Sequence, residues 1–306
     1  MTMKSVMTRC WWMIVCAATV QASVAAPPPA PATIARTPYL GAIAIDAATG
    51  DVLKEDRADE RGNPASMLKL MTLYVVLDAI HSGEIGTNDL VKVSAEVTRM
   101  GGSQVFLAEH EEFTVEELIY ATMVQSANDA ALALALHTAG SRDAFVERMN
   151  RKARELKLNR TVFHSMHGLP PGEDQVADWT SARDFARLCH RLLADHPGVL
   201  TYTATRERAF RPAQPFIMRN HNRLLFSFEG CDGLKTGYYR AAGYSVAATA
   251  QRDGVRAIVV ILGSADRKER DTQAQAWMTD ALNRLRAARA AKPAAPALPA
   301  PAPVTP

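Results

Sequence analysis

The sequence has few cysteines, few aromatic residues and no marked excess of charge of either sign. Its 306 residues include four cysteines and 7% aromatic residues, and 35 basic against 32 acidic side chains give a formal charge of +3. So few cysteines exclude a disulfide scaffold. A near-neutral chain lacks the basic field that holds phosphate backbones, which argues against nucleic acid as a partner. With 48% hydrophobic residues, the chain can bury a sizeable core.

The N-terminal segment lacks the length of a membrane-spanning helix. Lys4 and Arg9 precede an apolar run at positions 10–20, which has about 11 residues against the roughly 20 that a span requires. Small residues follow at 22–26, in the order of charge, apolar core and cleavage site that marks a secretory signal. We therefore predict a cleaved signal peptide at 1–25 and export to the periplasm.

The remaining chain divides into one globular part and two Pro/Ala-rich ends. Residues 26–33 are predicted to be a linker and residues 290–306 a disordered tail, which leaves 34–289 as the catalytic domain. Hydrophobic periodicity predicts a hairpin of strands at 39–46 and from 52, and helices at 67–80, 115–139, 142–156 and 181–193. Later strands are expected at 234–236, 244–250 and 256–262, before a closing helix. Strands at both ends of a helical middle predict an α+β fold with a mixed sheet.

The first chemical motif is a serine and a lysine at the start of the first long helix. Ser66 and Lys69 are three residues apart, so they share a helix face and a neutral amine can take the proton of the hydroxyl. Taken alone, the same spacing also fits a serine that caps the helix and a lysine that is exposed to solvent.

Two further motifs follow. An apolar helical stretch is interrupted by four polar residues, Gln125, Ser126, Asn128 and Asp129. Such polar groups cost stability unless they line a cleft, which makes the run a candidate site. A buried connection between helices, with its polar groups hydrogen-bonded, also fits this pattern. The run 235–237, Lys-Thr-Gly, enters a predicted strand. Its lysine and threonine suit capture of a peptide carboxylate at a sheet edge, and its glycine lets a ligand backbone come close.

In this order the three motifs form the signature of penicillin-binding proteins and class A β-lactamases. The sequence resembles the low-molecular-mass penicillin-binding proteins, which are serine-type D-alanyl-D-alanine carboxypeptidases, over nearly all of its globular part. Similar stretches lie at 63–72, 113–118, 167–170, 180–184 and 219–225. The resemblance implies an antiparallel sheet flanked by helices, an all-helical subdomain, and neither cofactor nor metal.

The resemblance also implies roles for individual residues. Ser66 is then the nucleophile that forms an acyl-enzyme with the penultimate D-alanine of a peptidoglycan stem peptide, and penicillins acylate it. Lys69 is the base, made neutral by burial and a neighbouring cation. Ser126 relays a proton to the leaving amine, while Asn128 holds the substrate amide and Lys69.

The same resemblance assigns the binding of the terminal carboxylate to Lys235 and Thr236, with Gly237 permitting the close approach. The backbone amides of Ser66 and Tyr238 form the oxyanion hole. A further cation is expected near the carboxylate, and Arg270 stands at the matching place, with Arg267 and Lys268 as alternatives.

Two features depart from the family pattern. Tyr238 and Tyr239 follow the Lys-Thr-Gly motif, where relatives commonly have a histidine or another polar residue. The chain also ends soon after Leu285, so we expect it to lack the appended domain and anchoring helix of many relatives, and to have no stable membrane anchor. The shorter plan also occurs in D,D-endopeptidases that cleave peptidoglycan crosslinks, which are the nearest alternative.

Single features suggest three different functions. Glu155 begins a Glu-x-x-Leu-Asn pattern like that of class A β-lactamases. His164 and His167 are three apart, but the chain has no His-Glu-x-x-His motif for a zinc peptidase. A non-enzymatic wall-binding module is disfavoured because every expected site residue is present. Cys189 and Cys231 remain after processing and are either buried thiols or a disulfide.

Overall fold

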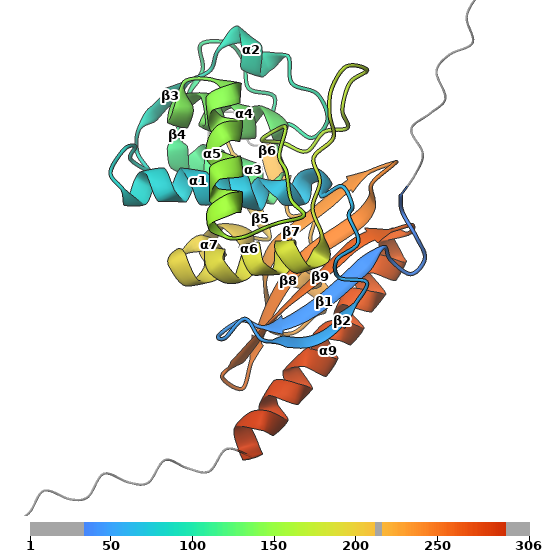
Figure 1. The fold of residues 1–306 in the computed structure, drawn as a ribbon. Helices are drawn as coiled ribbons and strands as arrows, with labels where there is room; N and C mark the ends of the chain where they lie inside the picture. Colours follow the sequence, from blue (N-terminus) through green and yellow to red (C-terminus); the bar gives the residue numbers. More distant parts are fainter. Residues whose placement is uncertain (1–33, 212–215, 292–306) are drawn as a thin grey trace, which may run out of the picture. The chain divides into compact units, whose positions relative to one another are not determined.

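A five-stranded antiparallel sheet organises the described part of this computed structural model, residues 34–211 and 216–291 (Figure 1). The order across the sheet is β2-β1-β9-β8-β7, so the N-terminal hairpin lies beside the last strand. The strands are β1 (Gly41–Asp46), β2 (Val52–Asp56), β7 (Cys231–Tyr239), β8 (Gly243–Arg252) and β9 (Val255–Ser264). Both β2 and β7 are therefore edge strands.

The central strands are buried on both faces. In β1, Ile43 and Ile45 pack into the core on the helical side, while Ala42 and Ala44 pack into a second core under the last helix. This alternation follows from the two-residue period of a strand. It explains why β1 and β9 read as nearly continuous apolar runs instead of alternating with polar residues.

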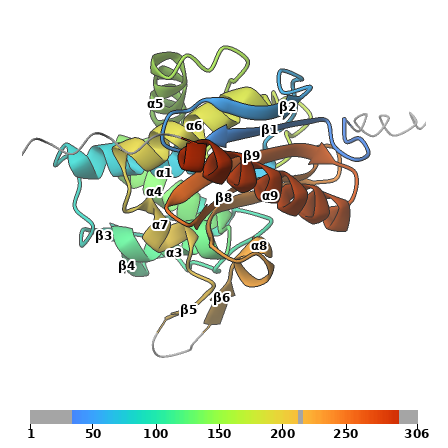
Figure 2. The ribbon, with the colours of Figure 1, turned by 90° about the horizontal axis from the view of Figure 1, so that it is seen from below.

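Helices cover the two faces of the sheet unequally. Helix α9 (Arg267–Ala291) packs along one face against β8 and β9 (Figures 1 and 2). Helix α6 (Ala182–Asp195) packs on the opposite face, against β1 and β9, and joins the helical layer. That layer is completed by α1 (Lys69–His81), α3 (Val115–Val124), α4 (Asn128–Ala139) and α5 (Arg142–Glu155).

Short elements fill the connections. Two small antiparallel sheets were not predicted, because strands of three and four residues leave too short a pattern. One pairs β3 (Leu90–Lys92) with β4 (Glu112–Thr114), and the other pairs β5 (Glu207–Phe210) with β6 (Phe216–Arg219). The remaining elements are the 3-10 turn η1 (Ala65–Leu68) and the helices α2 (Ala95–Thr98), α7 (Val199–Thr203) and α8 (Leu224–Ser227).

Three expectations need correction. The sheet is antiparallel throughout, as the resemblance implied, and not mixed, as the order of the elements had suggested. The single helix expected at 115–139 is two helices, because Ser126 takes a left-handed backbone conformation with φ of 61° and ends the helical hydrogen bonding. The helix expected from 67 starts as a 3-10 turn, and its α-helical part begins at Lys69.

The ends of the chain are described only in part. The predicted signal peptide and linker, and the tail from residue 292, lie outside the described residues, whereas positions 290 and 291 continue α9. Within the described ranges, no helix combines the length and the apolar character that crossing a membrane requires. Cys189 and Cys231 are free thiols, and Cys189 is buried as its helix face predicts.

Candidate active site

Ser66 lies in the turn η1, and tertiary hydrogen bonds hold the segment that leads to it. Gly62 and Thr180 exchange backbone hydrogen bonds of 2.8 and 2.9 Å. The next residue, Asn63, is buried and donates its side-chain amide to the backbone oxygen of Asp178 at 2.8 Å. These contacts fix the position from which the Ser66 hydroxyl projects.

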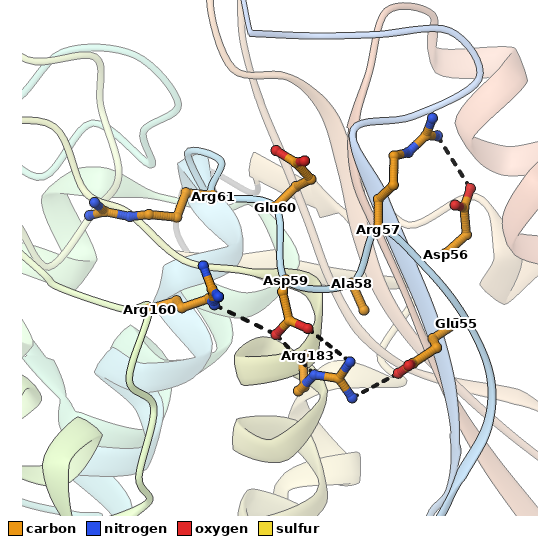
Figure 3. Close-up of a pocket in the computed structure, with 9 residues that line it drawn as sticks. All are labelled: Glu55, Asp56, Arg57, Ala58, Asp59, Glu60, Arg61, Arg160 and Arg183. Carbon is orange, nitrogen blue, oxygen red and sulfur yellow. Dashed lines mark hydrogen bonds and ion pairs between the residues drawn. The ribbon is translucent and has the colours of Figure 1, made fainter.

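A cluster of ion pairs lies further back along the same segment (Figure 3). Arg183 donates to both carboxylate oxygens of Asp59 at 3.0 and 2.9 Å and lies 2.7 Å from Glu55, while Arg160 lies 3.6 Å from Asp59. Hydrogen bonds to Asp59 and Glu55 raise the pKa of Arg183, and the bond from Arg183 lowers the pKa of Asp59. These four residues, hereafter the Arg183 cluster, join the end of β2 to the start of α6.

Lys69 is fully buried beside Ser66. Its Nζ lies 2.9 Å from the Oγ of Ser66 and 2.6 Å from both the Oδ1 of Asn128 and the backbone oxygen of His167. The last two atoms can only accept hydrogen bonds. A neutral amine has two N–H donors and one lone pair, so it satisfies both acceptors and leaves the lone pair for the proton of Ser66.

The environment of Lys69 favours that neutral form. Its pKa lies well below the ordinary value, first because burial disfavours the charge and then because Lys235 adds a second positive charge. The carboxylates of Asp129 and Asp178 act in the opposite direction. Within the described residues no carboxylate forms an ion pair with Lys69, so the lysine is placed as a base and not as a structural cation.

The break between α3 and α4 brings the second motif to this point. Ser126 occupies the left-handed turn, and Asn128 begins α4 with only 2% of its surface exposed. Asn128 donates its side-chain nitrogen to the backbone oxygen of Gly101 at 2.7 Å, which turns its oxygen toward Lys69. Its backbone amide donates to the oxygen of Ser103 at 2.8 Å. Of the polar run, Ser126 therefore lines the cleft described below, and Asn128 lies behind it, hydrogen-bonded to Lys69.

Two buried aspartates support the site: Asp129 was predicted only as a member of the polar run, without a role of its own, and Asp178 was not predicted. Asp129 accepts hydrogen bonds from the amides of Val105 and Leu107 at 3.1 to 3.3 Å, and so holds the loop that begins at Gly101. Asp178 accepts from the amides of His164 and Ser165 at 2.6 and 3.0 Å and fixes the loop whose His167 oxygen contacts Lys69. Burial raises the pKa of Asp178, while these donors lower it.

Lys235 is the second buried lysine of the site. It lies on edge strand β7 with 2% of its surface exposed, and its Nζ donates to the Oγ of Ser126 at 2.9 Å and to the oxygen of Thr236 at 3.2 Å. Burial, followed by the charge of Arg270, lowers the pKa of Lys235 to about 7. Ser126 thus lies in a hydrogen-bonded chain at the edge of the sheet.

Gly237 brings β7 against the turn that carries the nucleophile. A Cβ atom at this position would lie 2.3 Å from the oxygen of Pro64 and 3.1 Å from the amide nitrogen of Ser66. Real Cβ atoms do not make such contacts, so a side chain here would push the two segments apart. The close approach that the glycine permits is therefore to the chain's own backbone, and it places the segments of Ser66 and Tyr238 side by side.

These elements enclose a cleft of about 330 Å³ that contains most of the predicted site residues. Its walls come from η1, β7, β8, α9, the turn between α3 and α4, and the loops that follow α2 and β6. The lining residues are Ser66, Ser103, Ser126, His221, Thr236, Gly237, Tyr238, Tyr244, Arg267 and Arg270. Lys69, Asn128 and Lys235 lie directly behind them, hydrogen-bonded to Ser66 or Ser126.

Of the three candidate cations, two line the cleft. Arg270 is buried, donates its Nε to Asp271 at 2.9 Å, and donates an Nη to the backbone oxygen of Ser245 at 3.3 Å. Arg267 is exposed at the outer rim of the same cleft. Lys268 is exposed and does not line it.

Three lining residues were not predicted as site residues: Ser103, His221 and Tyr244. His221 belongs to the stretch 219–225 that resembles the family, which was the only signal for it. Burial, and then the charges of Lys235 and Lys69, lower the pKa of His221, although the residue is exposed at the mouth of the cleft. The imidazole is therefore a neutral group at the rim.

The features that suggested a β-lactamase or a zinc peptidase do not form such sites. Glu155 is exposed at the end of α5, where it pairs with Lys152 at 3.1 Å, and it does not line the cleft. The ring of His167 accepts a hydrogen bond from the amide of Leu169 at 3.1 Å, while its backbone oxygen contacts Lys69. Within the described residues, His164 and His167 belong to no cluster of three metal-binding side chains.

The family profile and the curated proteins that match this chain carry the same description. The family profile described as D-alanyl-D-alanine carboxypeptidase, peptidase family S11, matches residues 29–266. The chain is 37% identical over 245 residues to D-alanyl-D-alanine carboxypeptidase DacF of Bacillus subtilis, covering 79% of this chain and 62% of that protein. It is 36% identical over 245 residues to DacC of Escherichia coli, covering 78% and 59%. The chain thus spans about three fifths of the length of these relatives.

Solved structures give the same result. Penicillin-binding protein 6B of Escherichia coli is similar with a TM-score of 0.73 and 32% identity, covering 84% of this chain and 78% of that one. Penicillin-binding protein D2 of Listeria monocytogenes, in its ampicillin-bound form, is similar with a TM-score of 0.72 and 28% identity, covering 80% and 97%. The α+β fold expected from the sequence is therefore the fold of these proteins.

Proposed function

The chain belongs to the D-alanyl-D-alanine carboxypeptidase family, and from that premise we propose that it is a serine D,D-carboxypeptidase of peptidoglycan stem peptides. The reaction removes the terminal D-alanine of a pentapeptide through an acyl-enzyme on Ser66. One observation carries the proposal: the buried Nζ of Lys69 lies 2.9 Å from the Ser66 hydroxyl, and its other two neighbours are pure acceptors.

Acylation proceeds from this geometry. The Oγ of Ser66 attacks the carbonyl carbon of the penultimate D-alanine while its proton passes to the neutral Lys69. Negative charge develops on the carbonyl oxygen, which faces the backbone amides of Ser66 and Tyr238 on the two adjoining segments. The C–N bond then breaks, and the proton that Lys69 took from Ser66 passes to the leaving amine by way of the Ser126 hydroxyl, which accepts a hydrogen bond from Lys235.

The substrate is held at its free end. The terminal carboxylate binds at Lys235 and Thr236 on the edge strand, with Arg270 behind it, while Asn128 contacts the substrate amide. A positive charge on Lys235 is needed for this contact, whereas Lys69 must be neutral. Water finally attacks the ester carbonyl, which releases the shortened peptide and restores Ser66.

β-Lactams are proposed to acylate the same serine. Their amide carbonyl and carboxylate stand in the places of the scissile bond and the terminal carboxylate. The ampicillin-bound structure of Listeria monocytogenes penicillin-binding protein D2, which shares the fold, supports this proposal.

We also propose that the enzyme acts in the periplasm after removal of residues 1–25. The charged, apolar and small-residue order of that segment supports export. In the mature chain, we propose a catalytic domain at 34–289 between a short linker and a Pro/Ala-rich tail. An intact mass of the exported protein that begins at Ala26 is the expected result, and a mass that retains Met1 would contradict it.

Release of D-alanine from a synthetic pentapeptide that ends in D-Ala-D-Ala tests the proposed reaction. Wild type is expected to release one D-alanine per peptide, and Ser66→Ala to lose at least about 10³-fold in rate. Ser227→Ala, in the short helix α8, is the matched control and should keep the wild-type rate. No release by wild type, or equal release by Ser66→Ala, would reject the proposal.

A further inference from the structure

The cleft continues outward past the place where a terminal carboxylate is bound. Thr236 and Arg270 are buried, with 7% and 2% of their surfaces exposed. Tyr238, Tyr244 and Arg267 line the same cleft closer to solvent, and Tyr238 is 51% exposed. We call these last three residues the outer subsite.

The charge of the outer subsite has no counter-ion among the residues that the structure describes. Arg270 is paired with Asp271, but the side chain of Arg267 forms no ion pair or hydrogen bond within the described residues. The neighbouring Asp266 uses its carboxylate to accept the amide of Glu269 at 2.9 Å. None of the ten residues that line the cleft is acidic. An exposed, unpaired guanidinium in a cleft without carboxylates suits an anionic group of a ligand.

The two tyrosines form a fixed wall beside that charge. Tyr238 and Tyr244 are opposite each other in the β7–β8 register, and their rings are stacked 4.0 Å apart at 18°. Arg267 lines the same cleft as both tyrosines, so the guanidinium and the ring pair face one space. Stacked rings offer a flat surface for an aliphatic chain, with a cation at its end.

We propose that the outer subsite binds a leaving residue that is longer than alanine and carries a second carboxylate. Arg267 and Arg270 are three residues apart on α9, on one helix face and about 4.5 Å apart along its axis. The buried Arg270 then meets the α-carboxylate of the leaving residue, and Arg267 meets the second carboxylate. This inference rests on the proposed function: the same bond is cleaved, and only the leaving amine differs.

Two substrates supply this chemistry. One is a stem peptide that ends in a D-dicarboxylic residue such as D-glutamate. The other is a crosslink whose leaving strand begins with a D-amino acid centre and carries further carboxylates. The second would make the enzyme a D,D-endopeptidase in addition to a carboxypeptidase.

The test compares kcat/KM for three substrates: a pentapeptide ending in D-Ala-D-Ala, the same peptide ending in D-Ala-D-Glu, and a purified crosslinked muropeptide dimer. Wild type, Arg267→Gln and Arg267→Lys are measured, with Lys268→Gln as the matched control that removes an equal charge one residue away, outside the cleft. The quantity of interest is the kcat/KM of each dicarboxylic substrate divided by that for D-Ala-D-Ala.

Arg267→Gln is expected to lower this ratio about fivefold, the scale of one exposed ion pair. Arg267→Lys should restore part of it, and Lys268→Gln should leave it unchanged. A fall in the ratio for the D-glutamate peptide alone, for the dimer alone or for both supports the subsite. The substrate whose ratio falls is the one that the subsite binds. An unchanged ratio for both substrates, or an equal fall in Lys268→Gln, overturns it.

The acylation of each variant by benzylpenicillin, followed by mass, separates the two proposals. If benzylpenicillin acylates wild type and all variants but the kcat/KM ratio does not change, the outer subsite is rejected and the proposed function stands. Absence of both acylation and peptide cleavage in wild type rejects the proposed function and the subsite with it.

Discussion

The Arg183 cluster and the two lysines of the cleft place similar charges in opposite environments. In the cluster, every charged group has a partner of opposite sign, and hydrogen bonds between them hold Arg183 and Asp59 in their charged forms. Directly behind the cleft lining, Lys69 and Lys235 are buried and form no ion pair with any residue that the structure describes, and burial lowers the pKa of each, which favours the neutral form.

The difference separates a structural from a chemical use of charge. The concavity beside the Arg183 cluster has about 720 Å³, against about 330 Å³ for the cleft, yet its charges neutralise one another (Figure 3). An unpaired buried amine is costly to maintain, and it is the group that can exchange a proton near neutral pH. Size alone would select the larger concavity, whereas the buried lysines hydrogen-bonded to Ser66 and Ser126 favour the cleft as the proposed active site.

Replacing Lys69 by arginine should have the largest effect. A guanidinium stays protonated at every accessible pH and cannot take the proton of Ser66. We expect the acylation rate with benzylpenicillin to fall at least about 10³-fold, measured by intact mass over time. Lys92→Arg, on the exposed strand β3, is the matched control. A Lys69→Arg protein that acylates within tenfold of wild type would exclude Lys69 as the base.

Gly237→Ala should come next. The new Cβ atom meets the Pro64 oxygen at 2.3 Å, so β7 must move away from the turn that carries Ser66. A displacement of about 1 Å at a reacting centre costs on the order of 10²-fold in rate. Gly198→Ala, where a Cβ atom has no neighbour within 4 Å, should keep wild-type acylation. Equal rates for both variants would show that the contact does not position the nucleophile.

The pH dependence should show the cost of a buried lysine. The positive charge of Lys235 is complete below its pKa of about 7 and is lost as the pH rises through that value. We expect kcat/KM for a peptide with a free carboxylate to fall up to tenfold per pH unit above about 7, and Lys235→Arg to remove this alkaline limb. A wild-type profile that stays flat to pH 9 would contradict the assignment of Lys235.

Arg183→Gln should have the smallest effect on chemistry. It breaks the ion pairs with Asp59 and Glu55, and because these groups are partly exposed the free energy of unfolding should fall by only about 1 kcal/mol. Acylation should stay within twofold of wild type, since the hydrogen bonds of Gly62 and Asn63 remain. A tenfold loss of acylation would mean that the cluster also positions Ser66.

From the sequence, we could predict those residues of the candidate site that belong to short motifs. The three motifs indicated Ser66, Lys69, Asn128 and Lys235, and the structure brings these residues to one cleft. The N-terminal hairpin and the late strands were also predicted, because their apolar periods are long enough to read. Resemblance to a family, rather than spacing alone, joined the three motifs, of which Ser126 in the second lies 60 residues after Ser66 and Lys235 in the third a further 109 residues on.

What the sequence did not predict depends on tertiary contacts. Asp178 supports the site through a loop that contacts Lys69, and nothing near Asp178 in the chain signals that role. The helix expected at 115–139 breaks at Ser126, because the buried polar contacts of Asn128 and Lys235 outweigh a continuous helical period. From the sequence, the glycine of the Lys-Thr-Gly motif was explained by the close approach of a ligand. In the structure, the backbone that lies close to this glycine is the chain's own turn, which carries Ser66.

The most direct test of the central claim is a time course of intact mass for the mature protein mixed with benzylpenicillin, alongside Ser66→Ala. A neutral Lys69 beside Ser66 predicts a single covalent adduct that persists for minutes in wild type and does not form in the variant. An unmodified mass while the antibiotic is hydrolysed would indicate a β-lactamase. An unmodified mass with intact antibiotic, or equal labelling of Ser66→Ala, would contradict the assignment of Ser66 as the nucleophile.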